Sequence, residues 1–201
     1  TSAATSTDGG VTDASTSAGD FSAPGATATT TTDVTIPLPG NRDVAATVCA
    51  PTAGADRPLV IISPGFAQGI DQYASYCAHL ASWGYPTVVA EYDGIIPNHS
   101  EAADDRAAIV DWAATEPSLA AWDGARVAVA GHSLGGKVSI LAAIRDPRID
   151  LVVAWDPVDA GSPSVAPEQV GELAAPLVLL GETLDGTAGD GIGAQACAPS
   201  I

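Results

Sequence analysis

Short apolar runs alternate with helix-length segments along most of this chain, and that alternation restricts the folds open to it. Most of the runs are rich in β-branched and other apolar residues at successive positions, which is typical of strands buried on both faces. Such strands belong to a parallel sheet with helices packed on either side. We therefore expect an α/β fold with a mostly parallel sheet covered on both faces. The expected strands are 44–49, 59–63, 87–92, 126–130, 149–155 and 176–181, and the expected helices are 70–81, 101–115 and 134–144.

The first segment of the chain, residues 1–33, has a different composition. Serine and threonine supply nearly half of its positions, and lysine and arginine are absent. Such a segment buries too little apolar surface to offset its chain entropy. We expect a disordered, acidic Ser/Thr-rich linker over 1–33 and one α/β domain over 34–201. The linker is either the spacer of an exported protein, which places the protein outside the cell or in the cell envelope, or an ordinary disordered terminus.

The charge balance excludes several classes of protein. The 201 residues carry 24 acids and 7 bases, a net charge of −17, and such a surface repels phosphate backbones and anionic membranes. No apolar run reaches the length of about 18 residues that a transmembrane helix needs. No metal-ligand spacing is present either. We expect no nucleic-acid partner, no membrane span, no metal and no cofactor.

The strongest motif is Gly131-His132-Ser133-Leu134-Gly135, a G-x-S-x-G sequence between an expected strand and an expected helix. In that context the motif forms a nucleophile elbow. A sharp strand-to-helix turn strains the serine and exposes its hydroxyl, and the glycines let neighbouring backbone pass. We expect Ser133 to be a catalytic nucleophile. The competing interpretation is a plain glycine-rich turn.

Two backbone amides are expected to form an oxyanion hole beside Ser133. One belongs to Leu134, the residue after the nucleophile. The other is expected in the loop 63–69, at Phe66, which follows a glycine directly after an expected strand. Phe66 would also offer an apolar wall to an acyl group. The competing interpretation is a connecting loop in which Phe66 merely packs.

A serine hydrolase also needs a carboxylate that orients a histidine. Asp156 follows the expected strand 149–155, which places it at the carboxyl edge of the sheet, where the sites of α/β folds form. Asp185, after the next expected strand, and Asp159 are the second and third candidates. For each of them the competing interpretation is a solvated loop carboxylate or a helix cap.

The general base should follow the acid in chain order, but no histidine follows His132. His132 lies inside the motif and is expected to pack, and His79 is expected to be a surface or core residue of a helix. His99 follows the expected strand 87–92 at the correct edge and is the substitute candidate. We expect the catalytic histidine beyond Ile201, together with a final helix and strand.

The chain holds three cysteines, Cys49, Cys77 and Cys197. In an exported protein Cys49 can pair with Cys77, or Cys197 can pair with a residue beyond this sequence. Buried free thiols are the alternative.

Five stretches carry a family resemblance: IISPGF at 61–66, QYASYCAHLASWGYPTVVAEYDG at 72–94, GHSLGGK at 131–137, DPVD at 156–159 and CAP at 197–199. Through them the chain, from about residue 34 to residue 201, resembles the α/β-hydrolases. It is most similar to the chlorophyllases and their bacterial relatives, and next to polyester hydrolases and cutinases. The resemblance implies an α/β-hydrolase fold, a nucleophile at Ser133 and an acid at Asp156. Leu134 departs from the arginine of plant chlorophyllases, which favours a general esterase.

The sequence therefore predicts a serine carboxylic-ester hydrolase that acts on a small-molecule or polymeric ester through a Ser-Asp-His triad and an acyl-enzyme. The chain up to Ile201 is expected to be inactive without its histidine. The rival hypothesis is a catalytically inactive binding protein with a hydrolase fold, which the absent histidine favours.

Overall fold

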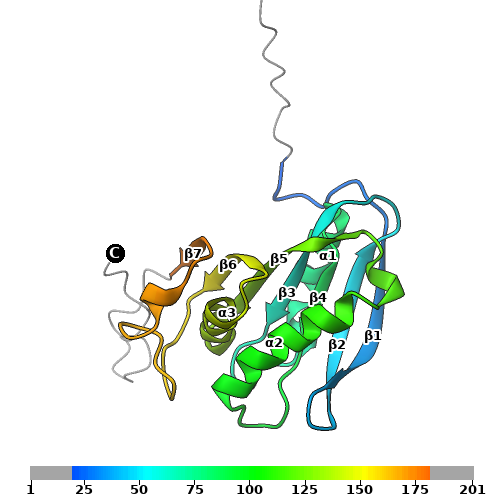
Figure 1. Cartoon of the computed structure of the whole chain (residues 1–201). Helices are drawn as coiled ribbons and strands as arrows, with labels where there is room; N and C mark the ends of the chain where they lie inside the picture. The colour runs from blue at the N-terminus through cyan, green and yellow to red at the C-terminus, as the bar shows by residue number, and fades with distance from the viewer. Residues whose placement is uncertain (1–19, 182–201) are drawn as a thin grey trace, which may run out of the picture.

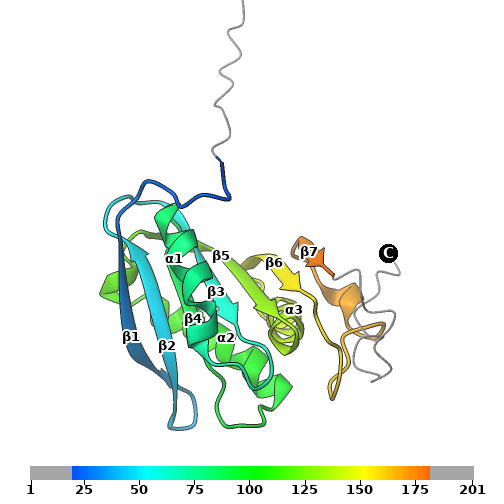
Figure 2. The same ribbon diagram turned by 180° about the vertical axis from the view of Figure 1, so that it is seen from behind.

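The computed structural model describes residues 20–181, which form a seven-stranded sheet with helices on both faces (Figures 1 and 2). The strand order is β1-β2-β4-β3-β5-β6-β7. The β1–β2 and β2–β4 pairs are antiparallel and the remaining pairs are parallel, which confirms the expected mostly parallel sheet. The strands are Thr29–Leu38 (β1), Arg42–Pro51 (β2), Arg57–Ser63 (β3), Thr87–Ala90 (β4), Trp122–His132 (β5), Ile149–Trp155 (β6) and Leu177–Leu180 (β7).

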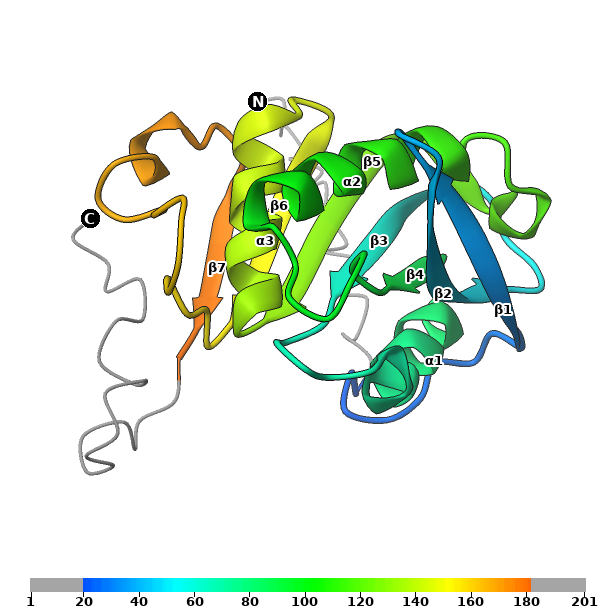
Figure 3. The same cartoon turned by 90° about the horizontal axis from the view of Figure 1, so that it is seen from below.

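Helix α1 covers one face of the sheet, and α2 and α3 cover the other (Figure 3). Helix α1 contacts β2 and β4, whereas α3 packs on β5 and β6 and against α2. Among residues 20–181, no helix combines the length and the hydropathy that a bilayer span requires. The α-helices are Ala74–Ser82 (α1), His99–Ala113 (α2) and Leu134–Arg145 (α3), and short 3-10 turns lie at Ile70–Tyr73 (η1), Pro117–Leu119 (η2) and Val170–Glu172 (η3).

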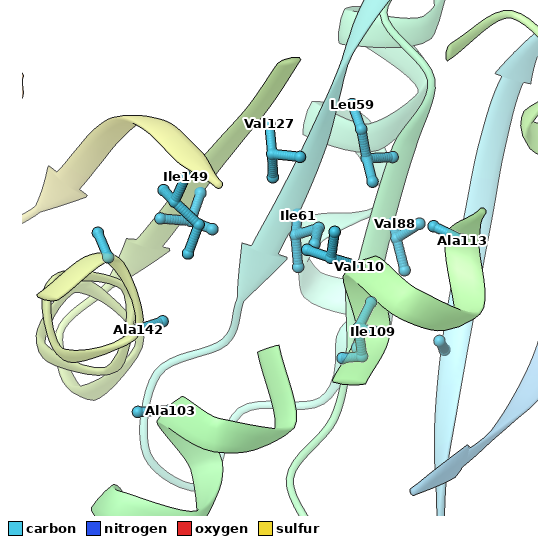
Figure 4. Close-up of a cluster of buried hydrophobic side chains, with 14 of the residues drawn as sticks. Leu59, Ile61, Val88, Ala103, Ile109, Val110, Ala113, Val127, Ala142 and Ile149 are labelled. Carbon is cyan, nitrogen blue, oxygen red and sulfur yellow. The ribbon is translucent and has the colours of Figure 1, made fainter. Parts of the chain in front are cut away.

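Strand β3 illustrates why an uninterrupted apolar run lies at the centre of the sheet. Leu59 and Ile61 belong to the core beneath α2 and α3, where Figure 4 shows them among other buried side chains. Val60 and Ile62 belong to the second core, which packs against α1. Because side chains alternate between the two faces of a strand, a strand covered on both faces needs an apolar residue at every position.

The parallel strands end in register at one edge of the sheet. Ser63 at the end of β3 pairs with Gly131 of β5, and Trp155 of β6 pairs with His132 and with Leu180. The loops that follow β3, β5 and β6 therefore leave the sheet side by side. This carboxyl edge is where ligand sites of open α/β sheets form.

The expected start of the domain at residue 34 is wrong, because β1 begins at Thr29, inside the segment predicted to be a linker. Thr29 pairs with Pro51 and Asp33 pairs with Thr47 in an antiparallel ladder. Threonine is β-branched and suits a strand, but a run of threonines shows no apolar alternation, so the pattern does not mark it as one. The expected disorder of 1–19 concerns residues that lie outside the described part of the chain.

A disulfide and hydrogen bonds to the segment before β1 tie α1 to the rest of the fold. Cys49 of β2 and Cys77 of α1 form a disulfide, with their Cα atoms 5.6 Å apart, so these two residues are paired rather than free thiols. At the end of α1, the indole Nε1 of Trp83 donates to the carbonyl of Ala23 at 3.1 Å. The alternative partner Cys197 lies outside the described residues.

Removal of the disulfide is expected to destabilise the fold. In a Cys49→Ala/Cys77→Ala variant the free energy of unfolding should fall by about 3 kcal/mol, because the cross-link restricts the unfolded chain over a separation of 28 residues. Urea denaturation measures the difference. Reductant should lower the stability of the wild type toward that of the variant and leave the variant unchanged. Equal stability of the oxidised and reduced wild type would contradict the prediction.

Candidate active site

Ser133 lies in a sharp turn between β5 and α3. Its backbone angles are φ 53° and ψ −117°, and a positive φ is strained for a residue with a side chain. Ser133 caps α3 without a side-chain hydrogen bond, so its hydroxyl is not committed to the helix. This local geometry matches the description of a nucleophile elbow. The catalytic role of the hydroxyl stays a prediction.

Backbone hydrogen bonds hold this strained turn from several sides. The amide of Ser133 donates to the carbonyl of Trp155, the last residue of β6, at 2.9 Å. The carbonyl of Ser133 accepts from the amides of Gly136 at 3.1 Å, Lys137 at 3.3 Å and Val158 at 3.2 Å. Two of these bonds come from β6 and the segment after it, so the turn cannot relax without moving that part of the chain.

Close backbone contacts explain the glycines of the motif. A Cβ atom at Gly131 would lie 2.2 Å from the carbonyl carbon of Gly135, and a Cβ atom at Gly135 would lie 2.0 Å from the carbonyl oxygen of Ser63. A Cβ atom at Gly136 would lie 2.9 Å from the Cβ of Pro157. The closest of these separations are far shorter than any ordinary packing contact. The ends of β3 and β5 and the first turn of α3 therefore meet only because no side chains intervene.

The loop after β3 carries the second expected oxyanion donor, Phe66. Its neighbour Gly65 donates its amide to the Tyr73 hydroxyl at 2.9 Å, and the amide of Gln68 donates back to the Gly65 carbonyl at 3.2 Å. Among residues 20–181, neither the Phe66 amide nor the Leu134 amide makes a backbone hydrogen bond in a loop or cap. The first amides of a helix have no partner within the helix, and Leu134 begins α3. Both amides thus stay the expected oxyanion donors.

Tyr92, which follows β4, supports the same loop from the other side. Its hydroxyl donates to the carbonyl of Pro64 at 2.7 Å. Burial raises the pKa of Tyr92 to about 12, although the guanidinium of Arg106, 5.0 Å from the ring centroid, opposes that rise. The hydroxyl therefore stays protonated at neutral pH and continues to donate to the loop.

The structure places Asp156 next to the serine turn, directly after β6. Its φ is 44°, a second positive value at this edge, and its amide donates to the carbonyl of Leu180 at 2.6 Å. Within residues 20–181, the hydrogen bond recorded for Asp156 is that of its backbone amide, and its carboxylate takes part in none. Asp156 is thus a residue with strained backbone at the same edge of the sheet as Ser133.

Asp159, the third candidate for the acid, is committed to local structure. Its carboxylate accepts from the Ser164 hydroxyl and the Val165 amide, both at 2.9 Å, and forms an ion pair with Lys137 at 3.1 Å. A carboxylate with these partners has little capacity left to orient a histidine. The second candidate, Asp185, lies outside the described residues.

Neither His132 nor His79 makes a hydrogen bond to Ser133 or Asp156 in the described part of the chain. His132 Nδ1 lies 3.1 Å from the Gln68 side-chain oxygen and 3.3 Å from the hydroxyl of Tyr73, the last residue of η1. His79 Nε2 lies 3.0 Å from a backbone carbonyl of the segment before β1. Both histidines are therefore engaged away from the two expected catalytic side chains.

His99, the substitute candidate for the base, begins α2 and packs against Gly161. Its Nδ1 is buried and has no hydrogen-bond partner among residues 20–181. Burial lowers the pKa of His99, the charge of Lys137 lowers it further, and Asp159 opposes both effects.

In the same part of the chain, no cluster of His, Cys, Asp and Glu has an arrangement that could hold a metal ion. The expected base beyond Ile201 lies outside the described residues.

Two cavities adjoin the loop that carries Phe66. The first, of about 440 Å³, is lined by residues 65–69 together with Tyr92, Ile95 and Pro97. Phe66 is 56% exposed and Ile95 is 91% exposed, so apolar side chains face solvent at its mouth. The second, of about 230 Å³, lies between the α1 side of the site and the ends of β5 and β6. Both cavities therefore offer apolar surface beside the loop that carries Phe66.

Sequence reasoning did not find the supporting roles of Tyr73 and Lys137. Tyr73 reads as one apolar position of a helix face, and its hydroxyl contact with Gly65 depends on the tertiary fold. Lys137 gives one signal, because it lies four residues after Ser133, the spacing that puts two residues on the same side of a helix. Its partner Asp159 is distant in sequence, so the pair itself is visible only in the structure.

Comparison with known proteins adds a family. A family model described as Chlorophyllase matches residues 19–200. The chain is also 27% identical over 124 residues to Chlorophyllase-1 of Arabidopsis thaliana, an alignment that covers 55% of this chain and 38% of that relative. The aligned part therefore spans less than half of the length of this curated relative.

A methyl group at Gly135 is expected to break the contact between β3 and α3. Gly135→Ala should lower the free energy of unfolding by about 3 kcal/mol, because its Cβ would overlap the carbonyl of Ser63. Gly171→Ala is the matched control, since nothing lies within 4 Å of a Cβ at that position. The control should change stability by less than about 0.5 kcal/mol in the same thermal or urea denaturation. Similar stability of the two variants would contradict the close contact.

Proposed function

Because the chain belongs to the chlorophyllase family of α/β-hydrolases, we propose that it is a serine carboxylic-ester hydrolase with Ser133 as its nucleophile. The observation that carries the proposal is the strained turn at Ser133, which has a positive φ and a hydroxyl not used for helix capping. Backbone strain of this kind costs on the order of 1–3 kcal/mol and clusters at active sites. The start of α3 also favours the negative charge that develops during ester hydrolysis.

The proposed reaction proceeds through an acyl-enzyme. The Oγ of Ser133 attacks the ester carbonyl carbon while a histidine takes its proton, and the amides of Phe66 and Leu134 hold the resulting oxyanion. The tetrahedral intermediate then breaks the bond to the alcohol, which leaves with the proton of the imidazolium. Water attacks the acyl group by the same route, releases the acid and restores the serine. Asp156 orients the histidine, which we expect beyond Ile201.

We propose an uncharged, apolar ester as the substrate. The exposed side chains of Phe66 and Ile95 at the mouth of the larger cavity supply apolar contacts for an acyl or alcohol group. The net charge of −17 disfavours anionic substrates. Leu134 stands where plant chlorophyllases carry an arginine, which favours a general esterase over an enzyme dedicated to chlorophyll.

An exported location accompanies this proposal. The pairing of Cys49 with Cys77 supports it, because disulfides persist in oxidising compartments and are rare in the cytosol. The Ser/Thr-rich composition of the residues before β1 agrees with a spacer in such a protein.

The rival hypothesis is a hydrolase-fold protein that binds an ester without cleaving it. One observation favours it: neither His132 nor His79 has a hydrogen bond to Ser133 or Asp156 in residues 20–181, and His99 packs against the loop after β6. The two hypotheses differ in a direct assay. An enzyme reacts with a fluorophosphonate at Ser133, whereas a binding protein without a base does not.

The first test concerns the nucleophile in the protein translated to its natural stop codon. Wild type should hydrolyse short p-nitrophenyl esters, and Ser133→Ala should lower kcat by about 10⁴- to 10⁶-fold, because it removes the attacking oxygen. Ser139→Ala, which changes a buried serine of the same helix, is the control and should retain turnover. A wild type that neither hydrolyses the esters nor reacts with a fluorophosphonate would refute the enzyme and favour the binding protein.

The second test identifies the acid. Asp156→Asn should keep the fold and lower kcat by about 10⁴-fold, because an amide does not hold the histidine in the required tautomer. Asp185→Asn provides the comparison, and there we expect nearly normal kcat. The opposite ranking of these two variants in the ester assay would assign the acid to Asp185.

A further inference from the structure

A buried ion pair joins α3 to the loop that follows β6. The side chain of Lys137 is 0% exposed and that of Asp159 is 6% exposed, with 3.1 Å between Nζ and Oδ1. The same ammonium donates to the carbonyls of Ala160 and Gly161, each at 2.8 Å. An ammonium has three donors, and here all three meet acceptors of one loop. A charge buried to this depth is tolerated only with such complete pairing.

Asp159 organises the loop from its other side. Its carboxylate accepts from the amides of Val165 and Ala166 and from the hydroxyl of Ser164, at 2.9 to 3.0 Å. Burial raises the pKa of Asp159, but these hydrogen bonds and Lys137 outweigh burial and hold the pKa below its usual value. The carboxylate therefore stays ionised, and the loop is closed around it and attached to α3 through it.

The anchored loop is the one that begins with the expected catalytic acid. Asp156 lies three residues before Asp159, and its carboxylate has no partner of its own among residues 20–181. Between the two, the amide of Val158 donates to the carbonyl of Ser133 at 3.2 Å. Lys137 lies one helical turn after Ser133 and donates its own amide to that same carbonyl at 3.3 Å. The position of the Asp156 carboxylate thus depends on how this loop is held against α3.

We propose that the Lys137–Asp159 ion pair is a positioning clamp, which holds the loop after β6 on α3 and so keeps Asp156 aligned with Ser133. The clamp rests on the function proposed above, in which Asp156 is the acid and Ser133 the nucleophile. Lys137 and Asp159 act through the loop and do not touch the substrate. Their effect is on the alignment of the catalytic side chains, where a displacement of about 1 Å lowers the rate by about 100-fold.

An ion pair with a purely structural role would affect stability and leave kcat unchanged. Replacement of both partners of a buried ion pair by uncharged side chains of similar volume is often neutral for stability, whereas removal of one partner leaves a buried charge. The double variant Lys137→Met/Asp159→Asn removes both charges and keeps an oxygen at residue 159 for the nearby amides. The single variant Lys137→Met frees the carbonyls of Ala160 and Gly161 but leaves Asp159 with its three local donors. Both variants therefore remove the contacts of the Lys137 ammonium with the loop after β6 and leave Ser133 and Asp156 unsubstituted.

The closing experiment compares kcat, KM and the melting temperature in the protein translated to its natural stop codon. In both variants the clamp predicts a kcat lower by about 10- to 100-fold, with KM nearly unchanged, because alignment acts on the transition state rather than on substrate binding. The melting temperature reports whether each protein is folded. The double variant, which leaves no unpaired buried charge, supplies the main measurement, and the single variant, in which Asp159 keeps its local bonds, supplies a second one.

A matched control is available on the same helix. Asp146, whose side chain is 7% exposed, caps the opposite end of α3 and pairs with Arg148 at 2.7 Å. Asp146→Asn/Arg148→Met removes that pair and should leave kcat at the wild-type value.

Two results would overturn the clamp. One is a folded Lys137→Met or double variant with wild-type kcat, and the other is a control variant with an equal loss of kcat. A wild type without esterase activity or fluorophosphonate labelling at Ser133 would instead refute the proposed function, and the catalytic role of the clamp with it.

Discussion

The close contact between the backbones of β3, β5 and α3 is the constraint on which the rest of the site depends. A side chain at Gly131 or Gly135 would overlap main-chain atoms of Gly135 or Ser63, so the strand ends and the first turn of the helix touch directly. The chain must reverse within one residue at this point, and Ser133 takes the positive φ that the reversal demands. The strain is thus a consequence of packing, and the packing of both cores against the sheet holds it in place.

From this contact the constraint extends to the neighbouring loops. The amide of Ser133 is bonded to the end of β6 and its carbonyl to the loop beyond, so the serine turn and the segment of Asp156 form one hydrogen-bonded unit. The loop after β3 is held separately, by the hydroxyls of Tyr73 and Tyr92. Three loops from three strands are therefore positioned by main-chain bonds and buried polar side chains. The chain belongs to the chlorophyllase family, and in the function proposed above these three loops hold the nucleophile, the acid and the oxyanion donors of an ester hydrolase.

Much of the fold follows from the sequence pattern, and the exceptions have physical causes. The strands β2 to β7 and the three α-helices lie where apolar runs and helical periodicity place them, because burial on both faces leaves a clear signal. Strand β1 was missed because its first half is a threonine run and Pro37 interrupts the short apolar alternation of Val34, Ile36 and Leu38, although an edge strand tolerates a proline. The same holds for the site. Local sequence patterns predict the Ser133 turn and the position of Asp156 after a strand. They do not predict the contacts of Tyr73 and Lys137 or the hydrogen bonds of Asp159.

By itself, the sequence determined the strand-to-helix turn at Ser133, since small residues around one serine between an apolar strand and a helix leave few other geometries. It also determined that Asp156 would follow a strand at the same edge. Only the tertiary structure showed that Asp159 meets the buried ammonium of Lys137, because the two residues come from segments far apart in the chain. It also decided the pairing of Cys49 with Cys77. Both outcomes depend on contacts between segments far apart in the chain, which local residue patterns do not encode.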